Sequence, residues 1–171
     1  SKALGEQILA WGLSERTPGS RFCSIRLPQL FDTEGECCRH QPWFGRIVAY
    51  TSRGLNLNMP PESGPRNFLH IQDAARLLIR AAQVDISGIW EACHPESMSH
   101  AEIAQHAYRV FGRGGAIRVD ANKAPFRHIT LPDGAPVFTR LGLQPRITMA
   151  RGLEMIRDAG TASAFGPMDV N

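Results

Sequence analysis

The hydrophobic positions between residues 67 and 82 change their spacing, and this change predicts a strand that leads directly into a helix. Residues 67–71 form a short apolar run after a loop rich in proline and glycine, which is typical of a strand. The apolar residues that follow recur at the three- and four-residue spacing of one helix face: Ala74, Leu77, Leu78, Ala81 and Ala82. Gln72 and Asp73 are placed to begin this helix. We expect the rest of the chain to be organised around this strand and helix.

The same patterns predict more strands and helices on both sides of this unit. Apolar runs predict strands at 22–28, 55–59, 88–94 and 116–120. The first of these has the composition of a buried inner strand of a parallel sheet. Helical spacing predicts a helix near the first residue, a second over 39–53, a third after a capping box at Ser99 and Glu102, and a last one from Thr148 with Leu153, Ile156 and Ala159 facing inward.

Composition limits the class of protein. A chain of 171 residues with 43% hydrophobic and 20% charged residues can bury a real core, as one domain or as part of a larger one. The net charge of +3 is small and the basic residues are scattered, which argues against nucleic acid as a partner. Because no run of about 18 apolar residues and no charged-then-apolar leader is present, we expect a soluble cytoplasmic protein without a membrane partner.

The four cysteines, Cys23, Cys37, Cys38 and Cys93, are spaced too irregularly for the disulfide framework of a small domain. Reduced thiols suit a cytoplasmic protein. Cys37, Cys38 and His40 stand close together, but no second paired set of ligands follows at a finger-like spacing. We therefore expect no metal site.

The central segment also carries a motif. Its residues fit the pattern R-[DN]-[FY]-x-H-[VI]-x-D-x-A at Arg66, Asn67, Phe68, His70, Ile71, Asp73 and Ala74. This pattern resembles a segment of the extended short-chain dehydrogenase/reductase family, the NAD-dependent epimerases and dehydratases of nucleotide sugars. The resemblance implies that Arg66 binds the diphosphate of a nucleotide sugar, for which the planar, permanently charged guanidinium is well suited. An alternative is that Arg66 only pairs with a carboxylate at the helix start, such as Asp73.

The first residues resemble the S-K-x-x-G-E segment of the same family, with Lys2, Gly5 and Glu6 in place. In that family a catalytic tyrosine stands four residues before the lysine, a position outside this chain. Residues four apart share a helix face, and a nearby ammonium favours the phenolate, so tyrosine can exchange protons near neutral pH. The resemblance implies that Lys2 is catalytic and also binds the ribose of the nicotinamide cofactor.

Residues 26–32 are similar to the family segment R-x-P-N-V-Y-G. The resemblance implies that the backbone at Pro28 and Leu30 contacts the nicotinamide and that Gln29 faces the substrate. The sequence departs from the family pattern at Gln29, Phe31 and Asp32, where the family has asparagine, tyrosine and glycine.

Two further segments are similar to the family. Residues 138–145 resemble a segment with the pattern L-G-W-x-P, and Arg127 stands roughly where some relatives have a second phosphate-binding arginine.

Together these similarities imply an α/β fold, the C-terminal part of a Rossmann-like extended short-chain dehydrogenase with a small α/β substrate-binding lobe. Residues 1–160 would form this portion, and residues 161–171, small and polar, would be a tail. The cofactor would be NAD or NADP, and the partners a nucleotide sugar and the missing N-terminal Rossmann half. Because the chain opens inside a helix, we expect a piece of a longer protein, inactive alone, that hides its apolar edge by self-association.

Two other functions are open at this point. The chain could be a non-catalytic dehydrogenase-like module that senses a nucleotide or binds a protein, which the departures at Gln29, Phe31 and Asp32 favour. The parent could also reduce carbonyl groups of other compounds than sugars. If Arg66 serves only the fold, a neutral residue of similar size there would leave binding of a nucleotide diphosphate unchanged.

Overall fold

The computed structural model describes residues 2–16, 19, 21–62 and 64–166. Within them the strands pair mostly in parallel. Strand β1 (Cys23–Arg26) pairs with β5 (Gly88–Glu91), β2 (Gln29–Phe31) with β4 (Arg66–His70), and β3 (Leu57–Met59) with β7 (Ile117–Val119), all three in parallel, while β6 (Ser97–Met98) is antiparallel to β4. The fold is therefore α/β with parallel sheets, as predicted.

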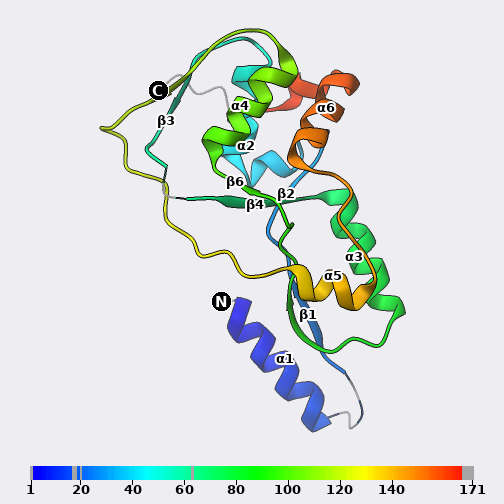
Figure 1. Cartoon of the computed structure of the whole chain (residues 1–171). Helices are drawn as coiled ribbons and strands as arrows, with labels where there is room; N and C mark the ends of the chain where they lie inside the picture. Colours follow the sequence, from blue (N-terminus) through cyan, green and yellow to red (C-terminus); the bar gives the residue numbers. More distant parts are fainter. Residues whose placement is uncertain (1, 17–18, 20, 63, 167–171) are drawn as a thin grey trace.

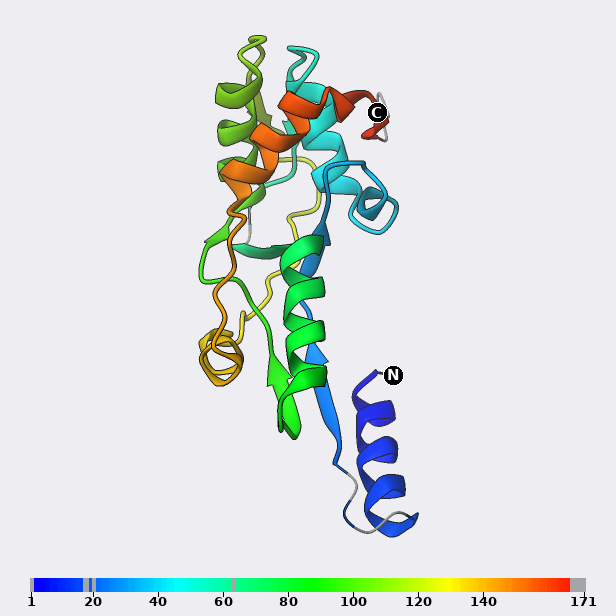
Figure 2. The same cartoon turned by 90° about the vertical axis from the view of Figure 1, so that its right-hand side faces the viewer.

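The helices are spread along the length of the molecule (Figures 1 and 2). Helices α2 (Pro42–Thr51), α4 (His100–Phe111) and α6 (Met149–Ala159) gather at one end, and α1 (Lys2–Arg16) lies at the other. Between them, α3 (Ile71–Gln83) and the short α5 (Ala135–Leu141) lie beside β1 and β5. Single turns of 3-10 helix span Cys37–Arg39 and Thr161–Ala164.

Strand β4 lies between two hydrophobic cores. All five of its residues are buried, and because side chains alternate along a strand, Phe68 packs into the core of α2, α4 and α6 while Leu69 packs into the core of α3 and α5. Helix α3 follows β4 without a loop. His70 is its N-cap residue, and the His70 ring accepts a hydrogen bond from the Gln72 N–H at 3.2 Å. The predicted central unit is confirmed.

Other predicted boundaries differ from the structure. Helix α2 begins at Pro42 rather than at residue 39, because Cys37–Arg39 forms a separate 3-10 turn. Strand β1 is parallel but is not a buried inner strand, since β5 is its one strand partner among the described residues and Cys23 is exposed. On α6, Leu153 and Ile156 face inward as predicted, whereas Ala159 is exposed.

The segment after α6 does not extend away from the molecule as a tail would. Thr161–Ala164 forms its 3-10 turn against α2 and α6, and the Phe165 side chain is 2% exposed. Its ring lies 6.0 Å from that of Phe44, centre to centre. The segment packs against the molecule because Phe165 is a large apolar residue that buries its ring. The small and polar residues around it in the sequence had suggested a tail. Residues 167–171 lie outside the described residues.

Candidate functional site

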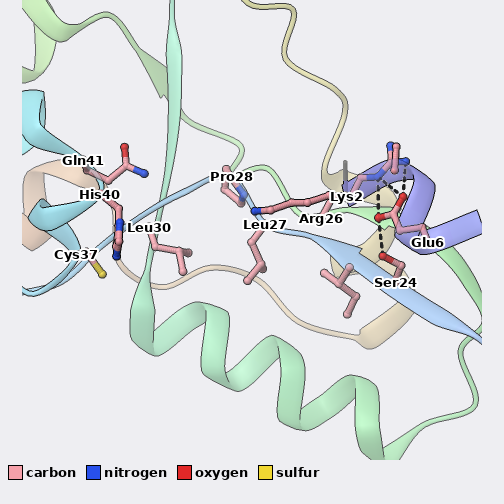
Figure 3. A pocket seen from close by; sticks show the side chains of 12 residues that line it. Lys2, Glu6, Ser24, Arg26, Leu27, Pro28, Leu30, Cys37, His40 and Gln41 are labelled. Atoms are coloured by element: carbon pink, nitrogen blue, oxygen red, sulfur yellow. Dashed lines mark hydrogen bonds and ion pairs between the residues drawn. The ribbon is translucent and has the colours of Figure 1, made fainter. Parts of the chain in front are cut away.

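A cavity of about 730 Å³ lies between α1 and the segment that joins β1 to β2. Three residues that the sequence assigns to the cofactor line it together: Lys2 from α1, and Pro28 and Leu30 from the β1–β2 segment. Figure 3 shows the Lys2 side chain pointing toward the turn at Leu27 and Pro28. We call this the first cavity. Its wall combines the Lys2 ammonium group, the paired side chains of Glu6 and Arg26, and an apolar surface to which Leu27, Pro28 and Leu30 contribute.

Helix α1 is joined to β1 by a charged contact. The Glu6 carboxylate accepts hydrogen bonds from the Ser24 hydroxyl at 2.7 Å and from Arg26 Nη2 at 2.7 Å. Arg26 Nη1 also donates to Glu91 on β5, at 2.8 Å. The hydrogen bonds from Arg26 and Ser24 lower the pKa of the Glu6 carboxyl, and those from Arg26 to Glu6 and Glu91 raise the pKa of the guanidinium. The network ties α1 to the β1–β5 pair.

Two of the three departures from the family pattern have structural explanations. The Phe31 ring is 1% exposed and meets Phe44 edge to face at 5.4 Å and His70 at 5.0 Å, both measured between ring centres. A phenol hydroxyl at this buried place would need a hydrogen-bond partner. Phe31 therefore suits this packed aromatic cluster better than tyrosine would.

Asp32 is the other explained departure. Its carboxylate is 3% exposed and accepts hydrogen bonds from the backbone N–H groups of Glu34, Gly35 and Cys37. Burial raises the pKa of the Asp32 carboxyl, but hydrogen bonds from the Cys37 thiol and these N–H groups outweigh it, and the pKa lies below its ordinary value. Asp32 thus organises the turn that leads to the 3-10 helix at Cys37–Arg39.

The second cavity, of about 390 Å³, borders the first. Arg26, Leu27, Pro28 and Gln41 line both cavities, whereas Gln29 lines the second. The Gln29 Nε2 group donates a hydrogen bond to Gln41 Oε1 at 2.7 Å. The position predicted to face the substrate therefore lies at a cavity wall, beside the residues predicted to face the cofactor.

Arg66 lies elsewhere, at the start of β4, and is 6% exposed. Its guanidinium donates to the backbone carbonyl oxygen of Arg127 at 2.6 Å and to that of Pro65 at 3.2 Å, and lies 5.9 Å from the centre of the Phe126 ring. Pairing with Asp73, the alternative from the sequence, is wrong. The Asp73 carboxylate accepts from Arg76 and from the N–H groups of Arg146 and Ile147.

The structure thus brings together only part of the predicted site. Lys2, Pro28 and Leu30 share the first cavity and Gln29 lies next to it, but Arg66 lines a separate hollow of about 10 Å³ beside Phe68 and Met98. The Arg127 side chain is exposed, and its backbone carbonyl is the group that meets Arg66.

Gln41 is a lining residue that sequence reasoning missed. It lines both cavities and bonds to Gln29. No motif marks it, because its position depends on how the loop before α2 folds back over β2. Among the described residues, no group of histidine, cysteine, aspartate or glutamate side chains could hold a metal ion, and no helix has the length and apolar surface needed to cross a bilayer.

No protein-family model matches the sequence, and no curated protein matches it. Solved structures do match. UDP-N-acetylglucosamine 4-epimerase from Methanobrevibacter ruminantium M1, in complex with UDP-N-acetylmuramic acid, is similar over 95% of this chain and 52% of its own, with 14% identity and a TM-score of 0.76. The enzyme of the same name from Bacillus cereus is similar over 90% and 52%, with 19% identity and a TM-score of 0.73.

A third similar structure is UDP-glucose-4-epimerase from Stenotrophomonas maltophila with bound NAD and formylated UDP-arabinopyranose. It covers 95% of this chain and 53% of its own, with 18% identity and a TM-score of 0.72. This chain has the fold of one half of such epimerases. It spans about half the length of the solved structures that it matches. The predicted α/β fold class with parallel sheets is confirmed by this similarity.

Proposed function

We propose that this chain is the substrate-binding half of an NAD(P)-dependent nucleotide-sugar epimerase or dehydratase, or of a keto-sugar reductase. It would need an N-terminal Rossmann half to act as an enzyme. The observation that carries the proposal is the first cavity, where Lys2 meets Pro28 and Leu30 although 26 and 28 positions separate them in the sequence. These three residues were assigned to the cofactor from sequence similarity alone.

The chemistry of the first cavity suits a nicotinamide nucleotide. An ammonium group can donate hydrogen bonds to ribose hydroxyls, and the apolar side chains of Leu27 and Leu30 offer a surface for a flat ring. The cofactor would supply hydride chemistry when bound. Lys2 would hold the ribose and favour the phenolate of a tyrosine placed four residues before it.

The non-catalytic alternative loses most of its support. Its basis was the set of departures at Gln29, Phe31 and Asp32. Phe31 and Asp32 are explained by core packing and by the turn that Asp32 organises, so they carry no sign of a degenerate site. Gln29 still has an amide side chain at a cavity wall.

The exposed stripe of α1 supports the expected partners. Leu4, Ile8 and Trp11 are 55%, 57% and 64% exposed. A run of large apolar side chains on one helix face is typical of a surface that another protein surface covers. We propose that the N-terminal half covers it in the complete protein and that the isolated chain self-associates. A clean monomer in sedimentation at high protein concentration would contradict the second statement.

The proposal is tested by NMR titration of the isotopically labelled chain with NAD and, separately, with UDP-glucose. We expect weak NAD binding that shifts signals of residues 24–30, and UDP-glucose binding that shifts signals around the second cavity. Lys2→Met should weaken NAD binding about tenfold, the order expected for one hydrogen bond to a charged group. Lys123→Met, the matched control outside both cavities, should leave it unchanged.

The proposal is contradicted if neither NAD nor UDP-glucose shifts the NMR signal of any residue that lines the two cavities. Equal effects of Lys2→Met and Lys123→Met would remove Lys2 from the site. The parent reading frame supplies an independent check. We expect a tyrosine four residues before Lys2 and a glycine-rich nucleotide-binding turn well before that.

A further inference from the structure

The segment between β7 and α5 has no helix or strand of its own (Figure 1, yellow). Four consecutive residues of this segment, 129–132, line the second cavity. Within the described part of the chain, these four residues form no backbone–backbone hydrogen bond. The place of this cavity wall therefore depends on how the segment is held on either side of it. We call residues 127–133 the strap.

The residue before the strap, Phe126, fixes its first end. The Phe126 ring packs against the rings of Trp43 and His100, at 4.8 and 4.3 Å between ring centres. Its backbone N–H donates a hydrogen bond to the Pro61 carbonyl oxygen at 3.2 Å. An aromatic residue packed on two sides is a firm anchor for the chain that follows it.

The residue after the strap, Gly134, fixes its second end. A Cβ atom on Gly134 would overlap the backbone carbonyl oxygen of Cys93, and Cys93 is itself a lining residue of the second cavity. Gly134 has φ −92°, a value that any residue adopts. Glycine is therefore suited to this position by the close approach of two backbone segments, not by its conformation.

Arg66 ties the strap to strand β4. The Arg66 side chain is buried, and its Nη2 group donates a hydrogen bond of 2.6 Å to the carbonyl oxygen of Arg127, the first residue of the strap. Ile129, the first strap residue that lines the second cavity, follows two positions later. A hydrogen bond from a charged donor is stronger than one between neutral groups. This bond thus sets where the strap begins its path along the cavity.

A ligand that fills the two cavities does not reach Arg66 directly, because Arg66 lines neither the first cavity nor the second. The hollow that Arg66 lines beside Phe68 and Met98 measures about 10 Å³. This volume suits about one water molecule and is too small for a diphosphate. Any effect of Arg66 on a ligand in the second cavity must therefore act through the strap.

We propose that Arg66 is a positioning residue, which holds the strap through the Arg127 carbonyl group and so sets the shape of the second cavity for the sugar part of a nucleotide sugar. This inference rests on the proposed function and adds a specificity-determining residue to it. The role differs from the contact with the diphosphate that the sequence resemblance implies. A residue that acts through the strap affects binding of the sugar part alone, whereas a diphosphate contact affects UDP and UDP-glucose equally.

The test measures the affinities of the chain for UDP-glucose and for UDP by calorimetry. Arg66→Met keeps an apolar side chain of moderate length and removes every donor. It should weaken UDP-glucose binding about tenfold, the order for one hydrogen bond from a charged group, and leave UDP binding unchanged. NMR relaxation of the methyl groups of Ile129 and Leu131 should show motion of larger amplitude in this variant.

Arg80→Met is the matched control. Arg80 also donates to the carbonyl oxygen of a residue distant in the sequence, Leu141, at 3.2 Å, and it lines neither cavity. We expect Arg80→Met to leave both affinities and the methyl relaxation of the strap unchanged.

Gly134→Ala tests the other end of the strap while Arg66 is intact. Because the added Cβ pushes the strap away from Cys93, this variant should also weaken UDP-glucose binding and not UDP binding. Gly12→Ala is its control, since a Cβ there meets no atom within 4 Å. Thermal unfolding establishes that each variant is folded, and Gly134→Ala carries the test if Arg66→Met does not fold.

Three results overturn the inference and leave the rest of the proposed function standing. The first is an equal loss of UDP and UDP-glucose affinity in Arg66→Met, which would assign the diphosphate contact to Arg66. The second is an unchanged UDP-glucose affinity in the folded variants Arg66→Met or Gly134→Ala. The third is a wild-type chain that binds UDP and UDP-glucose equally well. A wild-type chain that binds neither NAD nor UDP-glucose overturns the proposed function, and the inference with it.

Discussion

The turn organised by Asp32 gives a sharp test of whether a departure from the family pattern is structural. Asp32→Ala removes a carboxylate whose Oδ2 accepts from the Cys37 N–H at 2.7 Å and whose Oδ1 accepts from the N–H groups of Glu34 and Gly35. The substitution leaves these N–H groups without their acceptor. Because Asp32 is 3% exposed, water replaces the carboxylate poorly.

The expected loss of stability follows from these bonds. A hydrogen bond to a charged group contributes about 1.5–3 kcal/mol, and bonds that share one carboxylate are not additive. We therefore expect Asp32→Ala to lower the free energy of unfolding by about 3 kcal/mol. For a chain of this size, 1 kcal/mol shifts Tm by about 2–4 °C, so the expected fall is about 6–12 °C.

The assay is thermal unfolding followed by circular dichroism at neutral pH. Asp133→Ala is the matched control, since that carboxylate is exposed and bonds to the N–H of Ala135 alone among the described residues. It should cost less than about 1 kcal/mol. A fall in Tm for Asp32→Ala no larger than for Asp133→Ala would refute the structural explanation. The departure at Asp32 would then again favour the non-catalytic alternative.

Three further predictions concern stability. Burial and the nearby Arg66 lower the pKa of His100 to about 4, below its value in the unfolded chain. The free energy of unfolding therefore falls as the pH drops from about 6.5 toward 4. In urea unfolding, the difference in this free energy between pH 7 and pH 5 should be smaller for His100→Phe than for the wild type. Ser99→Ala breaks the capping box of α4 and should cost about 1 kcal/mol in the same assay. Gly152→Ala places a Cβ 2.3 Å from Phe31 Cε2 and should lower Tm, whereas Ala159→Gly, at an exposed position of α6, should lower it less.

The parts of the fold that could be predicted from the sequence are those set by local pattern. The change of period at residues 67–82 marks β4 and α3 because strand and helix spacing differ along a single segment. The capping box at Ser99 is similarly local. The burial of Phe165 is not set by local pattern, because it depends on contact with Phe44, which lies far away in the sequence.

The site could be predicted less well for the same reason. Sequence similarity identified Lys2, Pro28 and Leu30, which share a cavity. Proximity along the chain suggested Asp73 as a partner of Arg66. Arg66 begins β4, whose five residues span about 16 Å, and Asp73 lies beyond its other end, in the first turn of α3. Gln41 had no signal at all, since its contact with Gln29 arises only when the loop before α2 folds over β2.

The direction of Lys2 depends on Glu6, and this links the sequence motif to the cavity. Residues four apart share a helix face, so the contact of Glu6 with Ser24 and Arg26 turns the face that carries Lys2 toward β1. Arg26 is 43% exposed, and a pair this exposed contributes little to stability. Its consequence is orientation. A tyrosine four residues before Lys2 would lie on the same face by the same rule, and would point toward the first cavity together with Lys2.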